Sequence, residues 1–521
     1  MGMVASERRI ASAFYVFLGN YGDVSRHAHE QGVCRQWVYR EANKLRDFPA
    51  EAQQQIHVLQ QHVQELEQQN AVLEQRLSQA VVLDDAKQSE FAAEGQARGV
   101  GLANCHALLD VLVPGHALSV PTLGRRVKET QDKAGPLLAV LDEFTRPLVR
   151  DVAADELYVN DPVRMAVEQE SLCWISGNLG ATIDGEGWAN EFRQLPNLEQ
   201  VARDGGTALA KGVALVNAER QKQSQALVVD QGDHFHALRG AGVGLRKLQK
   251  QAAKALAAAE QAQTELEKRF RQGMPGSTGA GKHAATLWRK AEKAMDLWCE
   301  RERQWQQAKE AIRLLTPTGE LNTREHAEAV LAETLPLLPD PDFAKTKRQL
   351  QKPEMLNYLD RVQERIKALP FAEEVKQAAV RQECLRRRPD ALKGEGTQAA
   401  ALRGVMLMCA VILGKSGDAG QQAVTAVRDI FRRAYRASSL VECINSAIRM
   451  HQCRHRRMTQ GLLDLKRLHW NCHTFRTGRR RGTSPYQKLG VPWPEGLRWW
   501  DVLKLTPEQL RDKLSTAKMP S

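Results

Sequence analysis

The sequence predicts a multidomain protein, in which an amino-terminal all-α region precedes an α/β core that a large all-α insertion interrupts. Its 521 residues exceed what one hydrophobic core usually serves. The hydrophobic pattern is helical to about residue 147, mostly strand-like from 148 to 239, and helical again from 240 to 425. The expected units are 1–50, 51–84, 95–147, 148–239, 240–425, 426–492 and 493–521.

Composition argues against a membrane protein and against a disulfide-stabilised one. The longest uncharged apolar run, 405–413, is too short to span a bilayer and predicts a buried helix. The first residues carry charges where a signal peptide would be apolar. Nine cysteines are scattered without a C-x-x-C pair. These features predict a cytoplasmic protein with no membrane partner.

Residues 7–46 have the pattern of a helix-turn-helix. Helical stretches lie on both sides of Gly32, and the stretch that follows the glycine is basic. Such a second helix typically enters the major groove of DNA. The side chains expected to face DNA are Arg35, Gln36, Tyr39 and Arg40. A small structural bundle is the alternative.

A second, weaker helix-turn-helix candidate lies at 99–131. Ser119 is placed to cap a helix that has Pro121 in its first turn. Arg125 and Arg126 on that helix are expected to contact DNA.

A heptad pattern between these regions predicts a coiled coil at 56–80. A polar Asn70 interrupts the apolar series, and an asparagine at such a position fixes register and favours a two-stranded pairing. We therefore expect a homodimer or a higher oligomer. One long helix packed on its own domain is the alternative. The apolar positions are Ile56, Leu59, Val63, Leu66, Leu73, Leu77 and Ala80.

The region from 148 to 239 is expected to form the sheet. The stretches 152–159, 163–179 and 199–204 alternate as strands do, and 224–238 predicts a strand that runs into a helix. Adjacent strands followed by alternating helix and strand predict an α/β layer with a mixed sheet. This order is that of an RNase H-like core.

Three carboxylates stand at informative places in this pattern. Asp155 lies on the first strand, Asp204 ends a later strand before two glycines, and Glu442 lies in a helix. Carboxylates suit Mg²⁺ or Mn²⁺, and two such ions roughly 3.5 to 4 Å apart can hold the attacking and leaving oxygens of a phosphodiester. The three residues therefore predict a two-metal site that cuts or joins DNA.

A second polar cluster follows the last predicted strand. Asp230, Asp233 and His236 could support the metal ligands or contact the substrate. The start of a capped helix explains the same residues equally well.

Basic residues concentrate at the carboxyl end of the chain. From 430 to 521 there are 19 Lys and Arg against 6 Asp and Glu, an excess of 13, whereas the whole chain carries +12. Arginine clusters beside aromatic residues suit a phosphate backbone, and a solvated basic tail is the alternative. The expected DNA contacts are Arg454, Arg456, Arg457, Lys466, Arg467, Arg479, Arg480 and Arg481.

The segments SSLVECIN (438–445) and WNCHTFRTGRRRGTSPY (470–486), together with the strand region, resemble a DDE transposase of bacterial insertion sequences. The resemblance covers about 148–240 and 430–492. It implies an RNase H-like fold and a metal triad of Asp155, Asp204 and Glu442, with Asn445 close by. It also implies two Mg²⁺ or Mn²⁺ ions, double-stranded DNA as partner and a location at the bacterial nucleoid.

One departure from compact members of that family is the interval of 238 positions between Asp204 and Glu442. The intervening helical segment resembles the insertion domains that some of these enzymes carry. If that comparison holds, Trp288, Trp298 or Trp305 could stack on an unpaired base. Burial in the helical core is the alternative.

The insertion also contains GSTGAGKH (276–283), which matches a phosphate-binding loop in part. His283 stands where Ser or Thr should bind Mg²⁺, and the preceding segment is helical rather than a strand. A turn between two antiparallel helices explains the glycines, so no ATP binding is expected. The expected activity is metal-dependent DNA cleavage and strand transfer. A transposase-derived dimeric DNA-binding protein or repressor without catalysis is the alternative.

Overall fold

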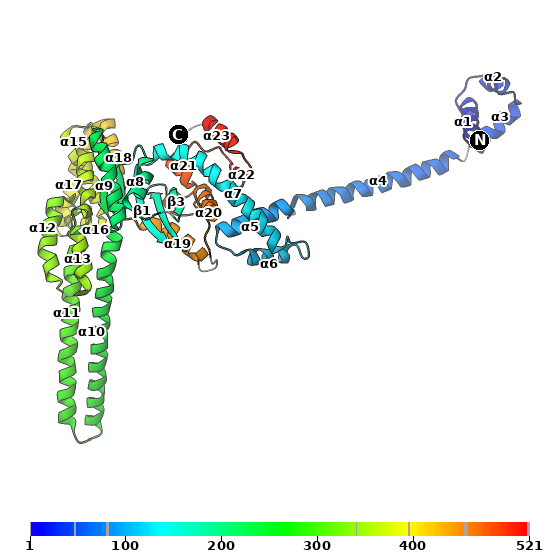
Figure 1. Cartoon of the computed structure of the whole chain (residues 1–521). Helices are drawn as coiled ribbons and strands as arrows, with labels where there is room; N and C mark the ends of the chain where they lie inside the picture. The colour runs from blue at the N-terminus through cyan, green and yellow to red at the C-terminus, as the bar shows by residue number, and fades with distance from the viewer. Residues whose placement is uncertain are drawn as a thin grey trace. The chain divides into compact units, whose positions relative to one another are not determined.

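The computed structural model describes residues 2–45, 48–79, 83–180, 182–339, 341–393, 396–452 and 457–517, without the side chains of 2–6, 48–56, 60, 76–79, 277, 391 and 450–452. The chain divides into two compact units, Met1–Asp84 and Asp85–Ser521. Figure 1 shows both units and labels many of their helices and strands.

The first unit contains the predicted helices. They are α1 (Gly2–Phe17), α2 (Asp23–Glu30), α3 (Arg35–Lys44) and α4 (Phe48–Gln79). Gly32 adopts φ +63° in the turn before α3. Val38 and Ala42 of α3 are buried, and Arg9 of α1 pairs with Glu41 at 2.9 Å. The side chains predicted to face DNA, Arg35, Gln36, Tyr39 and Arg40, are all exposed.

Helix α4 exposes the apolar seam that the heptad pattern predicts. Leu59, Val63, Leu66 and Leu73 are 62, 52, 46 and 58% exposed. Within the described residues of the first unit, nothing covers these four side chains, and the pairing of two such helices stays a prediction. Asn70 is exposed beside them. The side chains of Ile56, Leu77 and Ala80 lie outside the described residues.

The second unit is built on one five-stranded mixed sheet, as predicted. Its strands are β1 (Asp151–Tyr158), β2 (Pro162–Glu168), β3 (Trp174–Leu179), β4 (Gln200–Arg203) and β5 (Val229–Gly232). They lie in the order β3-β2-β1-β4-β5. β1 pairs antiparallel with β2 and parallel with β4, and β4 pairs parallel with β5. The carboxyl ends of β4 and β5 therefore meet at one edge of the layer.

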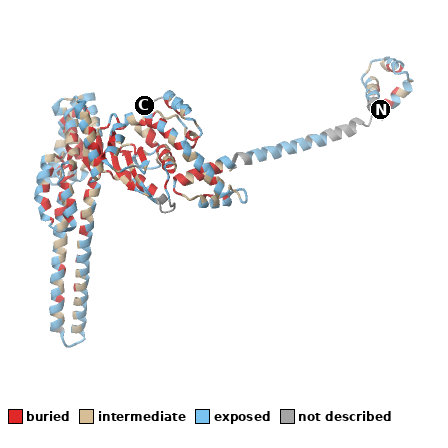
Figure 2. Ribbon diagram, in the orientation of Figure 1, coloured by how far each residue is buried: buried red, intermediate tan, exposed pale blue. Residues whose placement is uncertain are grey.

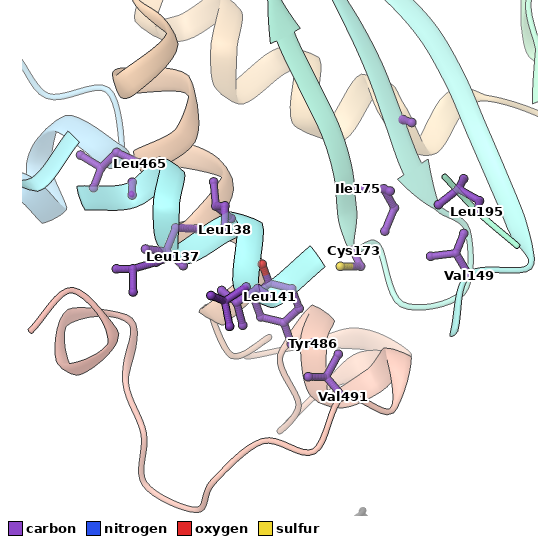
Figure 3. Packing of buried hydrophobic residues seen from close by; sticks show 14 of the residues in the cluster. Leu137, Leu138, Leu141, Val149, Cys173, Ile175, Leu195, Leu465, Tyr486 and Val491 are labelled. Carbon is purple, nitrogen blue, oxygen red and sulfur yellow. The ribbon is translucent and has the colours of Figure 1, made fainter. Parts of the chain in front are cut away.

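Helices from distant parts of the sequence share one hydrophobic cluster with the sheet. Leu137, Leu138 and Leu141 of α7 lie close to Tyr486 and Leu465 (Figure 3). The helices of this cluster are α5 (Asp85–Ala97), α6 (Leu102–Leu112), α7 (Val120–Thr145), α8 (Gly185–Arg193), α9 (Thr207–Lys222), α20 (Gln460–Cys472), α21 (Pro485–Leu489), α22 (Trp499–Val502) and α23 (Pro507–Thr516).

This packing changes two of the predicted boundaries. The helical segment begins at Asp85 rather than 95, and α5 to α7 pack on the sheet instead of standing apart. The described part of the predicted C-terminal tail, residues 493–517, packs on the core, because Leu510 and Leu514 of α23 are fully buried in the same cluster. Ser119 does cap α7, since its Oγ accepts a hydrogen bond from the Thr122 amide at 3.4 Å.

The opposite sheet face packs against α19 (Ser439–Gln452). Ala153 and Leu157 of β1 contact the cluster formed by Val441, Ile444 and Ile448 of α19. Because side chains alternate along a strand, Asp155 points to this same face. The sheet thereby turns its acidic residue toward the helix that carries Glu442.

The all-α insertion begins within α10, with no break at residue 240. Its helices are α10 (His234–Arg271), α11 (Ser277–Ala311), α12 (Arg324–Thr334), α13 (Ala344–Leu350), α14 (Asn357–Lys367), α15 (Glu373–Arg387), α16 (Pro389–Leu392), α17 (Thr397–Lys415) and α18 (Gly417–Arg432). α10 and α11 form a long hairpin whose outer part is mostly exposed (Figures 1 and 2). The turn contains Gly273 and Gly276 at φ +63° and +86°. Of the segment that resembles a phosphate-binding loop (276–283), only Gly276 belongs to this turn, and residues 277–283 form the first turns of α11. The segment follows a helix, as predicted, but its other two glycines are helical and do not form the predicted turn.

The two ends of the insertion lie together. This is necessary if Asp204 and Glu442, which lie on either side of the insertion in the sequence, are to share one site. The backbone amide of His234 donates to the carbonyl of Arg436 at 2.9 Å. The side chains of Gln200 and Gln169 donate to the carbonyls of Tyr435 and Ala437 at 2.9 and 3.0 Å. The sheet therefore holds both ends directly.

The insertion also covers the edge strand β5. The Tyr358 amide donates to Gln231 Oε1 at 2.7 Å, and Asn357 Nδ2 donates to the Asp230 carbonyl at 2.7 Å. Covering an edge in this way removes a template for pairing with other chains.

A buried ion pair fastens α14 to the sheet and gives a first prediction. Arg361 is 6% exposed and contacts Asp151 at 2.5 Å and Glu199 at 2.8 Å. We expect Arg361→Ala to destabilise the protein by about 3 to 5 kcal/mol, because it leaves Asp151 buried without its cation. Arg365→Ala is the matched control, since Arg365 also pairs with Glu199 but is more exposed. Denaturant unfolding should show a much smaller loss for Arg365→Ala, and equal losses would contradict this assignment.

Helix α17 differs from the prediction of a buried helix. Cys409 and Leu413 are buried, but Leu407, Met408 and Val411 are 69, 66 and 55% exposed. Among the described helices, α17 alone has the length and composition to cross a membrane, and a single such helix does not indicate a membrane protein. The eight described cysteines are free thiols.

Candidate active site

Asp155 occupies the middle of β1 and is only 8% exposed. Its Oδ1 accepts a hydrogen bond from the Glu156 amide at 2.8 Å, and its Oδ2 accepts one from Asn445 Nδ2 at 2.9 Å. Asn445 belongs to α19, so the contact joins residues 290 positions apart. The carboxylate is thus held from the sheet and from the helix that carries Glu442.

Asp204 follows the last residue of β4, as predicted. Its Oδ1 accepts a hydrogen bond from the Gly206 amide at 2.9 Å. A Cβ on Gly206 would lie 2.9 Å from that same Oδ1, so a larger residue at this position would displace the Asp204 carboxylate. The turn orients the carboxylate at the carboxyl end of the strand.

Glu442 lies in the first turn of α19, where the helix dipole favours a negative charge. Its Oε2 pairs with Arg449 at 2.8 Å, and its Oε1 lies 3.9 Å from His236 Nε2. Glu442 and Asn445 are three residues apart and so lie on neighbouring positions of one helix face. That face is directed at Asp155.

His236 connects the helix of Glu442 with the start of α10. Its Nδ1 lies 2.6 Å from Asp233 Oδ2, which fixes the ring while Nε2 faces Glu442. Asp233 also caps α10 by accepting from the amides of Phe235 and His236. Ser438 donates its hydroxyl to Asp233 Oδ2. The helix-cap explanation is therefore confirmed for Asp233, whereas a role of this cluster in supporting the carboxylates stays a prediction.

The charges of the site act on one another. Burial raises the pKa of Asp155 to about 6, and the negative charges of Asp204 and Glu442 act in the same direction. The hydrogen bond to Asp233 raises the pKa of His236, and the charges of Asp155 and Asp204 add to that effect. Burial would raise the pKa of Asp233, but the hydrogen bonds from His236 and Ser438 outweigh it and lower that pKa. The region is thus a cluster of repelling carboxylates that a cation would stabilise.

The donor chemistry fits a hard divalent cation. Asp155, Asp204 and Glu442 offer oxygen ligands, and Asn445 Oδ1 is a buried oxygen without a hydrogen-bond partner. In the described part of the chain, no group of three or more His, Cys, Asp or Glu side chains is gathered closely enough to hold a metal as it stands. For all three carboxylates to bind one metal site, at least one side chain would have to move. Glu442 would first have to leave its ion pair with Arg449.

A cleft opens beside Asp204. It has a volume of about 610 Å³ and lies between the glycine turn after β4, the start of α10 and α13. Arg239 and Lys345 line it together with Asp204 and His236. The cleft therefore places positive side chains next to the acidic cluster.

Asp230 of β5 forms an ion pair within the sheet. Its carboxylate makes two hydrogen bonds to the buried Arg203, at 2.7 and 2.6 Å. Arg203 also approaches Glu354 of the insertion at 3.5 Å. Arg203 also donates to the Asp204 carbonyl at 3.0 Å, and the support of the metal ligands by Asp230 stays a prediction.

Three of the basic residues predicted to contact DNA are used inside the protein. Lys466 is 4% exposed and donates to the Ala97 carbonyl at 2.8 Å, and burial lowers the pKa of this lysine to about 8. Arg467 is buried against Asp142 and the Trp174 carbonyl. Arg480 donates to the carbonyls of Glu170 and Gln169. The predictions for Lys466 and Arg467 are wrong, because both cations are buried against polar groups that lie far away in the sequence. Arg480 is half-buried, and its contact with DNA stays a prediction.

Most of the other basic residues predicted to contact DNA outside the first unit are exposed. Arg125, Arg126, Arg457, Arg479 and Arg481 are exposed, although Arg126 approaches Glu129 at 3.5 Å. Arg454 and Arg456 lie outside the described residues.

Most residues of the 470–486 motif have structural roles. Asn471 bonds both the amide and the carbonyl of Trp174, at 2.8 and 2.9 Å. Ser484 and Gln487 form a capping box at the start of α21, and Tyr486 is completely buried. The motif therefore fastens the carboxyl-terminal segment to β3.

The three tryptophans of the insertion differ in exposure. Trp305 is 3% exposed and packs in the core beside Phe343, so base stacking by this residue is wrong and the core alternative is correct. Trp288 and Trp298 are half-buried on α11.

Sequence reasoning missed Arg239, Lys345 and Arg449, which surround the carboxylates. Arg449 could have been found from its spacing of seven residues after Glu442 on one helix. Lys345 had no such signal, since only the folded insertion brings α13 to the cleft. Scans against protein-family models, curated proteins and solved structures returned no match to this chain.

Proposed function

We propose that the chain is a DNA transposase that cleaves DNA at the ends of an element and joins them to target DNA. The observation that carries this proposal is the approach of Asp204 and of the α19 residues Asn445 and Glu442 to Asp155, across an insertion of about 200 residues. The strand order β3-β2-β1-β4-β5 supports an RNase H-like assignment. Two-metal phosphodiester chemistry needs such a group of carboxylates on one side of a sheet.

The chemistry assigns distinct tasks to these residues. Asp155 and Asp204 would hold two Mg²⁺ or Mn²⁺ ions and Glu442 one, and the bound ions would activate a water or a 3′-hydroxyl and stabilise the leaving oxygen. Asn445 orients Asp155 through its amide. His236, fixed by Asp233, faces Glu442 and limits the positions that this carboxylate can take. Arg239 and Lys345 would hold the phosphates beside the cleavage point.

The exposed surfaces of the first unit suggest two partners for the protein, double-stranded DNA and a second copy of the chain. Arg35, Gln36, Tyr39 and Arg40 present a polar and basic helix face to double-stranded DNA, and the exposed seam of α4 would pair two protomers. The proposed location is the bacterial cytoplasm, at the nucleoid. The same features favour the second candidate, a dimeric DNA-binding protein or repressor without catalysis, which needs the first unit alone.

A strand-transfer assay separates these candidates. The donor is a plasmid that carries the DNA found on both sides of the gene, and the protein is the full chain with Mg²⁺, either wild type or Asp204→Asn. We expect cleaved ends and joined products from the wild type and neither from the variant. Binding without cleavage would favour the silent DNA-binding protein, and cleavage without joining would indicate a nuclease. Equal activity of the two proteins would refute the site.

A further inference from the structure

We infer that the exposed face of the inner half of α10 is a track for DNA phosphates, leading from the carboxylates along the α10–α11 hairpin. The inference rests on the proposed function and adds to it a DNA contact surface in the insertion. The residues that form this track are Arg239, Arg246, Lys247, Lys250 and Lys254, and all five are exposed.

The charge of this helix is strongly one-sided. From its start at His234 as far as Ala259, α10 contains no Asp or Glu, and its first acidic residue is Glu260. A solvated surface helix usually mixes both signs, since opposite charges three or four residues apart stabilise it. Five cations without an acidic residue on the same stretch of helix therefore weaken the isolated helix, and an anionic partner would stabilise it.

The five cations lie on one side of the helix. Their spacings of seven, one, three and four residues place them along a single stripe. The other side is packed inside the protein, where Ala237, Ala241, Gly244 and Leu245 are buried. A Cβ on Gly244 would lie 2.9 Å from the Asp342 Cβ, so the packed side approaches its neighbour closely. This packing fixes the rotation of α10 about its axis, so the five cations remain on its exposed side.

The neighbouring helix α11 carries acidic side chains beside its own cations, but no ion pair among the described residues joins them to the track; they are Glu292, Asp296, Glu300, Glu302 and Glu310. In the described chain, Lys247 pairs with Asp342 at 3.0 Å, and no ion pair involves the other four cations. The neighbouring helix α13 adds the exposed cations Lys345 and Arg348. The track is therefore available to an external polyanion.

Its position and length fit duplex DNA. Arg239 lines the cleft beside Asp204, so the track begins at the acidic cluster. At about 1.5 Å per residue, Lys254 lies roughly 22 Å further along the helix axis. Phosphates of one DNA strand advance about 3.4 Å each, so this distance corresponds to roughly six or seven nucleotides. A duplex held in the cleft could thus be contacted over more than half a helical turn.

Equilibrium binding to a fluorescent 30-base-pair duplex tests the inference without chemistry, since EDTA removes divalent ions. The track variant combines Arg246→Ala, Lys250→Ala and Lys254→Ala. The control removes the same charge with Lys222→Ala, Lys415→Ala and Lys513→Ala, which are exposed lysines on α9, α17 and α23. Because each lost phosphate contact lowers the slope of log K against log salt by about 0.9, we expect the track variant to lose about 2 to 3 units of slope. Its affinity at moderate salt should fall roughly tenfold or more.

The control should retain the wild-type slope. Equal slopes for the track variant and the wild type would overturn the inference, as would equal losses in the track variant and the control. A loss confined to an RNA duplex of the same length would overturn DNA as the partner. The proposed function and the track can fail separately. If the wild-type protein binds DNA through the track but never cleaves it in Mg²⁺, the transposase is refuted and the track is not.

Discussion

Replacing Glu442 by glutamine is expected to lower the rate of DNA cleavage by about three orders of magnitude while the protein stays folded. A metal ligand that stabilises developing charge contributes several kcal/mol to the transition state, and each 1.36 kcal/mol is a factor of ten. The side chain of Glu442 is 25% exposed, and glutamine keeps its size. Single-turnover cleavage of labelled DNA in Mg²⁺ measures the effect.

The control for this prediction is Asp161→Asn, which makes the same change of carboxylate to amide at an exposed position between β1 and β2. We expect wild-type cleavage from this variant and an unchanged thermal transition from both proteins. Cleavage by Glu442→Gln within a factor of about three of the wild type would remove Glu442 from the triad. Loss of cleavage together with loss of folding would point to a structural role.

The second large effect follows from the raised pKa of Asp155. The ionised carboxylate that activity requires is expected to lower the stability of the metal-free protein. Burial lifts this pKa from 3.8 to about 6, so the folded protein holds the proton more tightly than the unfolded chain does. The stability contributed by the protonated group is present below pH 4 and is lost as the pH rises through 6. At pH 8 without metal, the ionised carboxylate costs about 3 kcal/mol. Asp155→Asn should therefore melt roughly 3 to 6 °C above the wild type at pH 8, and this difference should vanish near pH 4.

Addition of Mg²⁺ tests the same explanation. A cation that binds only the folded protein should restore the stability that the ionised Asp155 removes. We expect millimolar Mg²⁺ to raise the melting temperature of the wild type at pH 8 and to leave Asp155→Asn nearly unchanged. A metal-free variant that melts below the wild type at pH 8 would show that Asp155 is a structural carboxylate. Asn445 favours the predicted outcome, since its free Oδ1 can accept from the amide introduced at 155.

The sheet could be predicted because its signals are local. Strands β1, β2 and β4 follow from alternation of apolar residues, and Asp204 was placed correctly because a glycine turn directly follows its strand. The interval before Glu442 also predicted that the ends of the insertion meet, as the bond between His234 and Arg436 shows. Short-range patterns fix these features, so one sequence is enough to find them.

The errors concern side chains whose partners lie far away in the sequence. Lys466 and Arg467 belong to a basic cluster in the sequence, yet they satisfy Ala97 and Asp142, more than 300 positions earlier. Exposed and buried arginines cannot be distinguished by composition, because the cost of burial is offset by carbonyls and carboxylates that only the fold supplies. Lys345 enters the cleft for the same reason, by way of a helix in the insertion.

Cleavage by Asp204→Cys in Mg²⁺ and in Mn²⁺, with Asp204→Asn alongside, tests the central claim most directly. Thiolate is a soft ligand that suits Mn²⁺ better than Mg²⁺. If Asp204 holds the metal ions, Asp204→Cys should be inactive in Mg²⁺ and regain cleavage in Mn²⁺, while Asp204→Asn should stay inactive in both. Wild-type cleavage by both variants in Mg²⁺ would contradict the metal triad.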